Sequence, residues 1–445
     1  MEDEQQVMDS KLNVAIIGGG LGGLALTIGL LPYRDHLNVS IYEAAPCFAE
    51  IGAGVASGPN AVHALGLISP DILERYRKCA TFNETRDRDN VWLSFRYGMD
   101  SKNEDGKKLD LIYHSGEKGK SLGDISEMLT REEIRRRSCV HRARFLDEMA
   151  ALVPDGIAKF EKNLVDVKEL GGDKEALELI FEDGEIAFAD VVIGCDGIKS
   201  ATRKYVMENQ SIEPHFADTY AYRAMVPRNI ARNAMGDDLT LNGQLYLGYG
   251  GYIITYPVEH GDLINMVALK KTKGIGWDKE NWLIRATQKE MLSDLEGYED
   301  NLVQLVSEYG TRDRWGLFDL PHSQKYYRGR ACLMGDAAHA STPHLGAGSG
   351  MAFEDAYVLS HLFEGVKNKN DVEKALEAYD TVRRPRSQKL IENSKRAGDI
   401  ISFSHEDFGD DVGRIAREID ALNEWVWDFD LEKSSLEAKQ LSGLF

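Results

Sequence analysis

Short apolar runs that end in glycine or in an acidic residue recur three times along the chain. The runs and the residues that follow them are Val14–Ile17 before the glycine-rich segment 18–23, Val191–Ile193 before Gly194-Cys195-Asp196-Gly197, and Ala331–Met334 before Gly335-Asp336. Such runs are typical of strands buried on both faces of a parallel sheet. Because the carboxyl ends of parallel strands lie at one edge, where ligands bind, the pattern predicts one long ligand contacted by three distant segments.

The first run opens a dinucleotide-binding motif. Gly18, Gly20 and Gly23 fit the spacing G-x-G-x-x-G, and the residues from Leu24 onward read as an apolar helix. In this motif the first glycine permits the turn, the second lets a pyrophosphate approach the backbone, and the third brings the helix against the strand. Glu43 follows the next apolar run, at the distance where a carboxylate binds ribose hydroxyls.

The middle of the chain is rich in aromatic and β-branched residues, which favours a mostly antiparallel sheet. Its predicted strands are Thr219–Val226, Gln244–Leu247, Tyr252–Val258 and Leu263–Leu269, with Val91–Gly98 and Leu109–His114 as further strands. Helices are predicted over Thr130–Leu152, Glu280–Tyr309 and Met351–Phe363, and over most of the chain from Val372. The first of these helices would begin at Thr130, with Glu133 completing a capping box.

Composition narrows the class of protein. With 445 residues and 43% apolar content, the chain is long enough for two or more lobes. Its net charge of −20 argues against nucleic acid and anionic membranes as partners. Five scattered cysteines give neither a disulfide framework nor zinc-ligand spacing, and they fit a reducing compartment.

A membrane or signal segment is the alternative interpretation of Val14–Leu31, which carries no charge. Its six glycines and the acidic start, Met1-Glu2-Asp3-Glu4, argue against that alternative. We therefore expect a cytoplasmic protein with no stable membrane association.

Three motifs together resemble those of a known family. Gly18–Gly23, Gly194-Cys195-Asp196-Gly197 and Gly335-Asp336-Ala337-Ala338-His339, in this order, are similar to those of the single-component flavoprotein aromatic hydroxylases, and most similar to the salicylate hydroxylase-like group. That group includes fungal enzymes that hydroxylate and dearomatise phenolic polyketides, and the likeness spans residues 11 to 390.

The resemblance implies an α/β fold. A Rossmann-like FAD-binding domain, as in para-hydroxybenzoate hydroxylase, would be interleaved with a mostly antiparallel substrate-binding sheet and followed by C-terminal helices. We expect the FAD-binding domain at residues 10–90, 130–205 and 325–385, the substrate-binding domain at 91–129 and 206–324, and the helical segment at 386–445.

The resemblance also implies which residues hold FAD. Glu43 would bind the adenosine ribose, Arg142 would face the sugar and phosphate side, and Asp196 would position the pyrophosphate. Asp336 would bind the ribityl hydroxyls, and the helix that opens after Gly346 would direct its positive end at the flavin. The expected FAD-binding residues are Gly18, Gly20, Gly23, Glu43, Gly54, Val55, Arg142, Asp196, Asp336, Gly348 and Ser349. His339 and His344 lack the spacing of metal ligands, so we expect no metal site.

The implied reaction begins with reduction of FAD by NADH or NADPH. O₂ then adds to give a flavin C4a-hydroperoxide, which hydroxylates a small phenolic substrate. Arg223 is the one positive charge in its predicted strand and is our candidate for anchoring a phenolate or carboxylate; the alternative is an arginine on an exposed sheet face. Tyr252 and Tyr256 share a strand face and are candidates for tuning the substrate's proton, although each could instead be a core residue. His322, in Leu320-Pro321-His322, is a weaker candidate.

Several alternatives stay open at this point. A salicylate-type ring, hydroxylated with or without loss of its carboxylate, is the favoured substrate, and a dearomatised resorcinol-type polyketide is the alternative. From other classes, the chain could be an NAD(P)-dependent dehydrogenase or a flavin-fold binding protein without turnover. We expect a monomer or a homodimer.

Overall fold

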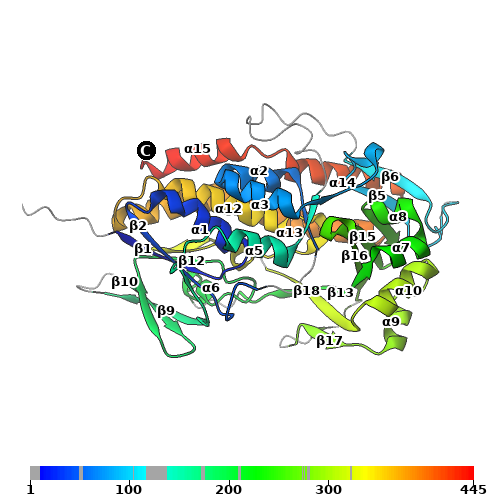
Figure 1. The fold of residues 1–445 in the computed structure, drawn as a ribbon, viewed down its shortest axis with the longest axis horizontal. Coiled ribbons are helices and arrows are strands. Elements are labelled where there is room, and N and C mark those ends of the chain that lie inside the picture. Colours follow the sequence, from blue (N-terminus) through cyan, green and yellow to red (C-terminus); the bar gives the residue numbers. More distant parts are fainter. Residues whose placement is uncertain are drawn as a thin grey trace, which may run out of the picture.

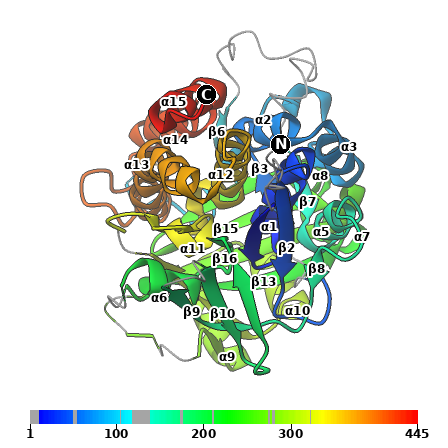
Figure 2. The same cartoon turned by 90° about the vertical axis from the view of Figure 1, so that its left-hand side faces the viewer.

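Two large sheets, one in each half of the molecule, are connected by long helices (Figure 1). The computed structural model describes residues 11–49, 54–103, 105–116, 138–171, 176–208, 212–272, 274, 276–277, 281–320 and 323–445. The view in Figure 2, turned by 90°, shows the first sheet with helices above it and a smaller antiparallel sheet below it.

The first sheet has six strands. In spatial order they are β19 (Tyr327–Arg328), β20 (Ala331–Leu333), β12 (Val191–Gly194), β1 (Leu12–Ile17), β2 (Leu37–Tyr42) and β8 (Ala158–Lys159). All neighbours are parallel except β19 and β20. Ile17 lies opposite Tyr42 on one side and Gly194 on the other, and Gly194 lies opposite Leu333. Four strands therefore end on one row.

Helices cover one side of this sheet. They are α1 (Leu21–Leu30), α2 (Pro59–Ile68), α3 (Pro70–Cys79), α5 (Arg142–Ala150) and α12 (Gly348–Phe363). α1 and α12 pack closely at Gly22 of α1 and Ala352 of α12. A Cβ at Gly22 would lie only 3.3 Å from the Cβ of Ala352. The antiparallel strands β9 (Leu164–Leu170), β10 (Ala176–Phe181) and β11 (Ile186–Ala189) lie on the other side (Figure 1). None of the described helices combines the length and apolar character that crossing a bilayer requires.

The second sheet has eight strands and is antiparallel except between β14 and β5. Its order is β17 (Leu283–Arg285), β18 (Asp313–Asp319), β13 (His215–Pro227), β16 (Leu263–Lys271), β15 (Gly251–Val258), β14 (Gln244–Gly248), β5 (Leu93–Tyr97) and β6 (Leu111–Ser115). Tyr222, Ile253 and Met266 share one hydrophobic cluster with residues of helices α7 (Arg228–Met235), α9 (Gln288–Asp294) and α10 (Asp300–Tyr309). Alternate residues, such as Tyr252 and Leu269, point to the opposite face, toward the C-terminal helices.

A small sheet replaces part of the helix predicted over Thr130–Leu152. Residues 117–137 lie outside the described residues, so Thr130 and Glu133 are not placed, but Ser138–His141 form a strand, β7, and the helix begins only at Arg142. β7 pairs with β3 (Gly54–Ser57) on one side and with β4 (Thr81–Phe82) on the other. The prediction was wrong here because backbone hydrogen bonds to two distant strands outweigh local helix propensity.

The helix predicted over Glu280–Tyr309 is also divided. Residues 278–280 lie outside the described residues, Leu283–Arg285 pair with β18 as β17, and two helices follow. Thr287 begins α9 with a capping box to Glu290, and Gly297, with φ of +93°, lies between α9 and α10. A left-handed glycine ends helical continuity, so the apolar pattern of the segment comes from two short helices.

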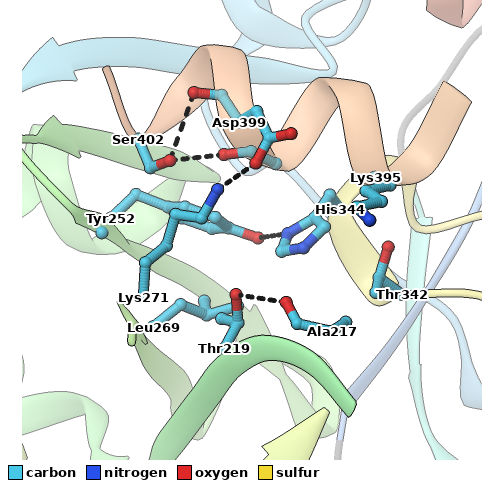
Figure 3. Close-up of a pocket in the computed structure, with 12 residues that line it drawn as sticks. Ala217, Thr219, Tyr252, Leu269, Lys271, Thr342, His344, Lys395, Asp399 and Ser402 are labelled. Atoms are coloured by element: carbon cyan, nitrogen blue, oxygen red, sulfur yellow. Dashed lines mark hydrogen bonds and ion pairs between the residues drawn. The ribbon is translucent and has the colours of Figure 1, made fainter. Parts of the chain in front are cut away.

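Helix α13 (Lys369–Ile401) links the two halves and is followed by α14 (Val412–Trp427) and α15 (Leu431–Ser442). Near its C-terminal end, Asp399 pairs with Lys271 of β16 (Figure 3). The Ser402 carbonyl oxygen, one residue after the helix, accepts a hydrogen bond of 2.9 Å from Gly250 N–H. The domain boundary expected between residues 385 and 386 falls inside this helix, and the division into domains stays a prediction.

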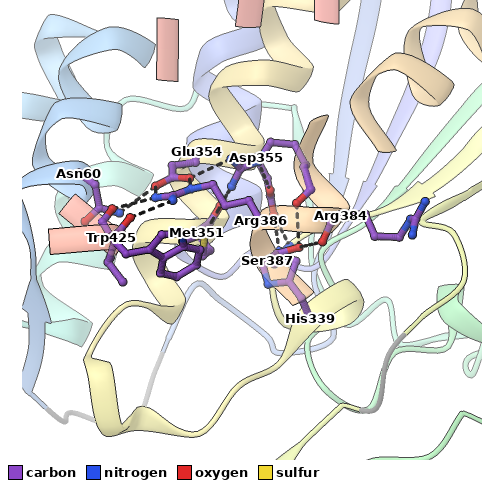
Figure 4. A network of polar contacts seen from close by, with 12 residues as sticks. Asn60, His339, Met351, Glu354, Asp355, Arg384, Arg386, Ser387 and Trp425 are labelled. Carbon is purple, nitrogen blue, oxygen red and sulfur yellow. Dashed lines mark hydrogen bonds and ion pairs between the residues drawn. The ribbon is translucent and has the colours of Figure 1, made fainter. Parts of the chain in front are cut away.

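The middle of α13 takes part in a buried ionic network with α12 (Figure 4). Arg386 forms a bidentate pair with Glu354, with distances of 2.7 and 2.8 Å, and Arg383 contacts both Glu354 and Asp355 at 2.8 Å. All four side chains are buried. Burial alone would raise the pKa of both carboxyl groups, but the arginines outweigh it for Glu354, and His339 together with Arg383 outweighs it for Asp355, so both pKa values are lowered.

This network also holds the loop that follows β20. Asp355 Oδ2 accepts hydrogen bonds from Gly335 N–H at 3.0 Å and from His339 Nε2 at 2.6 Å. Because folding lowers the pKa of Asp355 and Glu354, their contribution to stability is present above the pKa of an unfolded carboxyl group, about 4, and is lost as the pH falls through their folded values.

Replacing Arg383 should test the network. We expect Arg383→Met to lower the free energy of unfolding by about 3–5 kcal/mol, because it leaves buried carboxylates without a partner. Arg384→Met is the matched control: Arg384 lies on the same helix but is 33% exposed and pairs with Asp380, so its loss should cost about 1 kcal/mol or less. Urea unfolding followed by circular dichroism measures both, and equal losses would contradict the network's role.

Candidate active site

The three loops predicted to meet one ligand begin side by side, together with the loop of Glu43. Gly18, Glu43, Cys195 and Met334 each follow the last residue of the aligned row in β1, β2, β12 and β20. The prediction that three strand ends lie at one edge of the sheet is therefore confirmed. A ligand along this edge would meet segments that begin at residues 18, 43, 195 and 334 of the chain.

The turn after β1 has room for backbone only. Gly18 has φ of +103°, and a Cβ there would lie 2.4 Å from the carbonyl oxygen of Cys195. A Cβ at Gly23 would lie 2.1 Å from the carbonyl oxygen of Gly18. Gly20 is the N-cap of α1, which has no side-chain cap and no acidic residue in its first turn. The N–H groups and the positive end of α1 are thus available to an anion.

Glu43 fixes this turn from the neighbouring strand. One carboxylate oxygen accepts a hydrogen bond of 2.7 Å from Gly19 N–H, and the other accepts one of 2.8 Å from Ala45 N–H. Glu43 is half-buried beside the glycines, where the sequence placed it. Its contact with a ribose stays a prediction.

The two aspartates after β12 and β20 differ in what they bind. Asp196 is engaged within its own loop, accepting hydrogen bonds from Ser200 Oγ at 2.6 Å and from Thr202 N–H at 3.0 Å. Burial raises the pKa of Asp196, although these hydrogen bonds oppose the effect. Asp336 is exposed at the start of the short helix α11 (Asp336–His339), on the loop held by Asp355. Of the two carboxylates, that of Asp336 is the more available to a ligand.

A second uncapped helix start lies nearby. The segment Pro343–Leu345 forms one 3₁₀ turn, Gly346 is left-handed with φ of +60°, and α12 begins at Gly348. α12 has no side-chain cap at Ala347 and no acidic residue in its first turn, and Gly348 and Ser349 are half-buried. Its first N–H groups can therefore donate to a polar ring edge or an anion.

β3 and β7 bring three more predicted site residues together. Gly54 lies opposite His141, the residue before Arg142, and Val55 lies opposite Val140. The Tyr256 hydroxyl donates a 2.8 Å hydrogen bond to the Gly54 carbonyl oxygen. Residues 51–53, which precede Gly54, lie outside the described residues, as do residues 321–322, which include His322.

Arg223 lies half-buried on the face of the second sheet that carries Tyr252 and Tyr256. It pairs across the sheet with Val267, which in turn pairs with Ile254 of β15. Its guanidinium carbon is 4.7 Å from the ring centre of Trp315, and no carboxylate among the described residues forms an ion pair with it. Burial lowers the pKa of Arg223; nearby Tyr256 raises it and nearby Arg142 lowers it. Arg142, Arg223 and Tyr256 are thus neighbours.

Tyr252 is engaged elsewhere, in a contact that the sequence did not predict. Its hydroxyl lies 2.8 Å from His344 Nδ1, on the 3₁₀ turn before α12 (Figure 3). Burial lowers the pKa of His344 to about 4 and raises the pKa of Tyr252, so both groups are neutral at pH 7. The structure therefore separates Tyr252 from Tyr256, which the sequence treated alike.

Sequence reasoning also missed the network of Glu354, Asp355, Arg383 and Arg386. A signal was present, because Glu354 and Asp355 are the only acidic residues in the mostly apolar helix predicted over Met351–Phe363. Charges in such a position need partners, but the sequence does not show which distant arginines supply them.

The described residues fit FAD. Two uncapped helix starts, a turn without side chains and an exposed aspartate lie on loops at or near one sheet edge. These are the groups that bind the phosphates and the polar edges of a dinucleotide.

Comparisons with known proteins agree with this fit. Residues 159–394 match the family model described as FAD binding domain. The chain is 38% identical to 6-methylsalicylate 1-monooxygenase of Aspergillus terreus, over 97% of this chain and 92% of that protein. It is 34% identical to a salicylate hydroxylase of Pseudomonas putida, over 97% and 95%.

A solved structure of a salicylate hydroxylase substrate complex superposes with a TM-score of 0.81, at 31% identity, covering 96% of this chain and 98% of that one. The expected fold class is thereby confirmed. The relatives are monooxygenases, so a dehydrogenase and a binding protein without turnover are not favoured. The chain therefore belongs to the FAD-dependent aromatic monooxygenases of the salicylate hydroxylase group.

Proposed function

We propose that this enzyme uses FAD, NAD(P)H and O₂ to hydroxylate a salicylate-type ring, a phenol that carries a carboxylate. The observation that carries the substrate class is Arg223, a half-buried guanidinium with no carboxylate partner among the described residues. The names of two relatives, a 6-methylsalicylate monooxygenase and a salicylate hydroxylase, support the same class.

The environment of Arg223 favours an anionic ligand. Taking a cation out of water costs free energy unless an anion or good hydrogen-bond acceptors replace the water. A carboxylate or phenolate supplies both, and arginine binds a carboxylate with two parallel hydrogen bonds. The neighbouring Arg142 adds positive charge, which increases the preference for a ligand with negative charge over a neutral ketone.

The chain's own residues would divide the work in the following way. Glu43 and the turn at Gly18 hold the adenosine end of FAD, while Asp336 and the start of α12 hold the flavin end. Arg223 binds the substrate's anionic group and stabilises the ionised phenol, which makes the ring a better nucleophile. The hydroxyl of Tyr256 donates a hydrogen bond to Gly54 and so holds β3 beside the flavin ring. Bound FAD supplies the chemistry, passing two electrons from NAD(P)H to O₂, of which one oxygen atom enters the ring and the other leaves as water.

Three finer expectations belong with this proposal. A cytoplasmic location and a monomer or homodimer stay predictions, as does the division of the chain into an FAD-binding and a substrate-binding domain. The choice between NADH and NADPH stays open.

Arg223→Met should weaken substrate binding. We expect the KM for salicylate, or for the best substrate in a panel of salicylates, to rise about 10- to 100-fold. This is the size of effect expected when one charge-assisted hydrogen bond or ion pair is lost. FAD content should not change. The measurements are salicylate-stimulated NAD(P)H oxidation and product mass. Arg285→Met, an exposed arginine at the edge of the same sheet, is the control; an unchanged KM in Arg223→Met would remove Arg223 from the site.

Asp336→Ala should lose flavin. The purified wild-type protein should be yellow and absorb at about 450 nm because of its oxidised flavin. The variant should retain well under half of that absorbance per mole of protein. Asp183→Ala, in the exposed turn between β10 and β11, is the matched control and should keep its flavin. Full flavin occupancy in Asp336→Ala would refute the role given to this carboxylate.

A further inference from the structure

His344 connects three elements around one imidazole ring (Figure 3). Its Nδ1 lies 2.8 Å from the Tyr252 hydroxyl of β15. Its ring lies directly over Gly398 of α13, where a Cβ would be only 2.4 Å from His344 Cδ2. Its own backbone belongs to the turn Pro343–Leu345, which leads into α12. One side chain thus joins the second sheet, α13 and the loop that opens α12.

The surroundings of His344 are fixed on two sides. On the side of α13, Ser394 Oγ donates a 2.5 Å hydrogen bond to the carbonyl oxygen of Thr342, two residues before His344. On the side of the sheet, Lys271 pairs with Asp399. The cavity left among these residues measures about 10 Å³, which is at the lower limit for a single water molecule. The loop therefore has little space in which to shift.

Among the residues that the structure describes, His344 is the one hydrogen-bond partner of the Tyr252 hydroxyl. The ring of Tyr252 lies in the hydrophobic cluster that includes Leu247 and Leu269, with 4% of its surface exposed, and burial disfavours its ionised form. His344 is neutral, so the contact is a hydrogen bond between neutral groups. A buried hydroxyl of this kind holds two elements in register without itself titrating near neutral pH.

We propose that Tyr252 and His344 are positioning residues, whose hydrogen bond sets the distance between the loop that opens α12 and the face of the sheet that carries Arg223. This inference rests on the proposed function. The start of α12 would hold the flavin and Arg223 would hold the substrate, so the joint fixes the separation of the two reactants. Misplacement by about 1 Å can cost a reaction about 100-fold in rate.

Tyr252→Phe removes the hydrogen bond and keeps the ring. We expect FAD retention and substrate Kd to stay within about twofold, because the hydroxyl is already hydrogen-bonded to His344. Product formed per NAD(P)H oxidised should fall about threefold or more. The remaining electrons should appear as hydrogen peroxide. The double variant Tyr252→Phe/His344→Asn should form no less product per NAD(P)H oxidised than the more impaired of the two single variants, because the two residues act through one hydrogen bond.

Hydrogen exchange gives a readout that does not depend on turnover. In Tyr252→Phe, the amides of residues 344–351 should exchange faster than in the wild-type protein, since the loop loses its contact with the sheet. Gly398→Ala should have the same effect, because the new Cβ displaces the imidazole. Because alanine has a higher helix propensity than glycine, unfolding of α13 would not explain faster exchange in Gly398→Ala.

Tyr298→Phe is the matched control. Tyr298 is buried on the opposite side of the sheet, beside Gly248 and Gly251, and its hydroxyl has no hydrogen-bond partner among the described residues. Its coupling ratio and exchange should match those of the wild-type protein.

Two results would overturn the inference. The first is unchanged coupling and exchange in Tyr252→Phe, and the second is a substrate Kd raised about tenfold or more, which would make Tyr252 a substrate contact. If the wild-type protein binds flavin but hydroxylates no ring in a panel of phenols, the proposed function fails, and the exchange comparison alone decides the role of His344.

Discussion

The parallel register of β2, β1, β12 and β20 fixes where the ligand-binding loops leave the first sheet. Tyr42, Ile17, Gly194 and Leu333 lie on one row, so the loops that follow them leave the sheet at one edge. A shift of one residue in any pair would turn that strand's side chains to the other face and move its loop along the edge. Gly18 can then approach the carbonyl oxygen of Cys195 closely because it has no side chain: a Cβ at Gly18 would lie 2.4 Å from that oxygen.

Two buried or half-buried arginines differ in whether carboxylates of the described residues neutralise their charge. Arg383 is fully buried and contacts Glu354 and Asp355, so it is balanced within the chain and acts as structure. Arg223 is half-buried, faces the ring of Trp315 and has no carboxylate beside it among the described residues. The first arrangement holds the loop of Asp336 in place, and the second leaves a positive charge for an anionic substrate.

Helix α13 couples these two arrangements. Its middle holds α12 through Arg383 and Arg386, and its last turns contact the second sheet through Asp399 and the His344 loop through Ser394 and Gly398. This one helix thus contacts both the loops expected to hold the flavin and the sheet that carries Arg223.

Local spacing in the sequence was enough to predict the dinucleotide motif and the second sheet, and the resemblance of three motifs to a known family implied that the dinucleotide is FAD. Gly18, Gly20, Gly23 and Glu43 could be placed from their distances along the chain, and Arg223 stood out as a charge within an uncharged strand. The tertiary structure decided what depends on partners far away in sequence: the strand at Ser138–His141, the buried pairs of Arg383 and Arg386, and the separation of Tyr252 from Tyr256. Alternation along a strand shows which face a side chain occupies, but the neighbour it meets there is set by packing between distant elements.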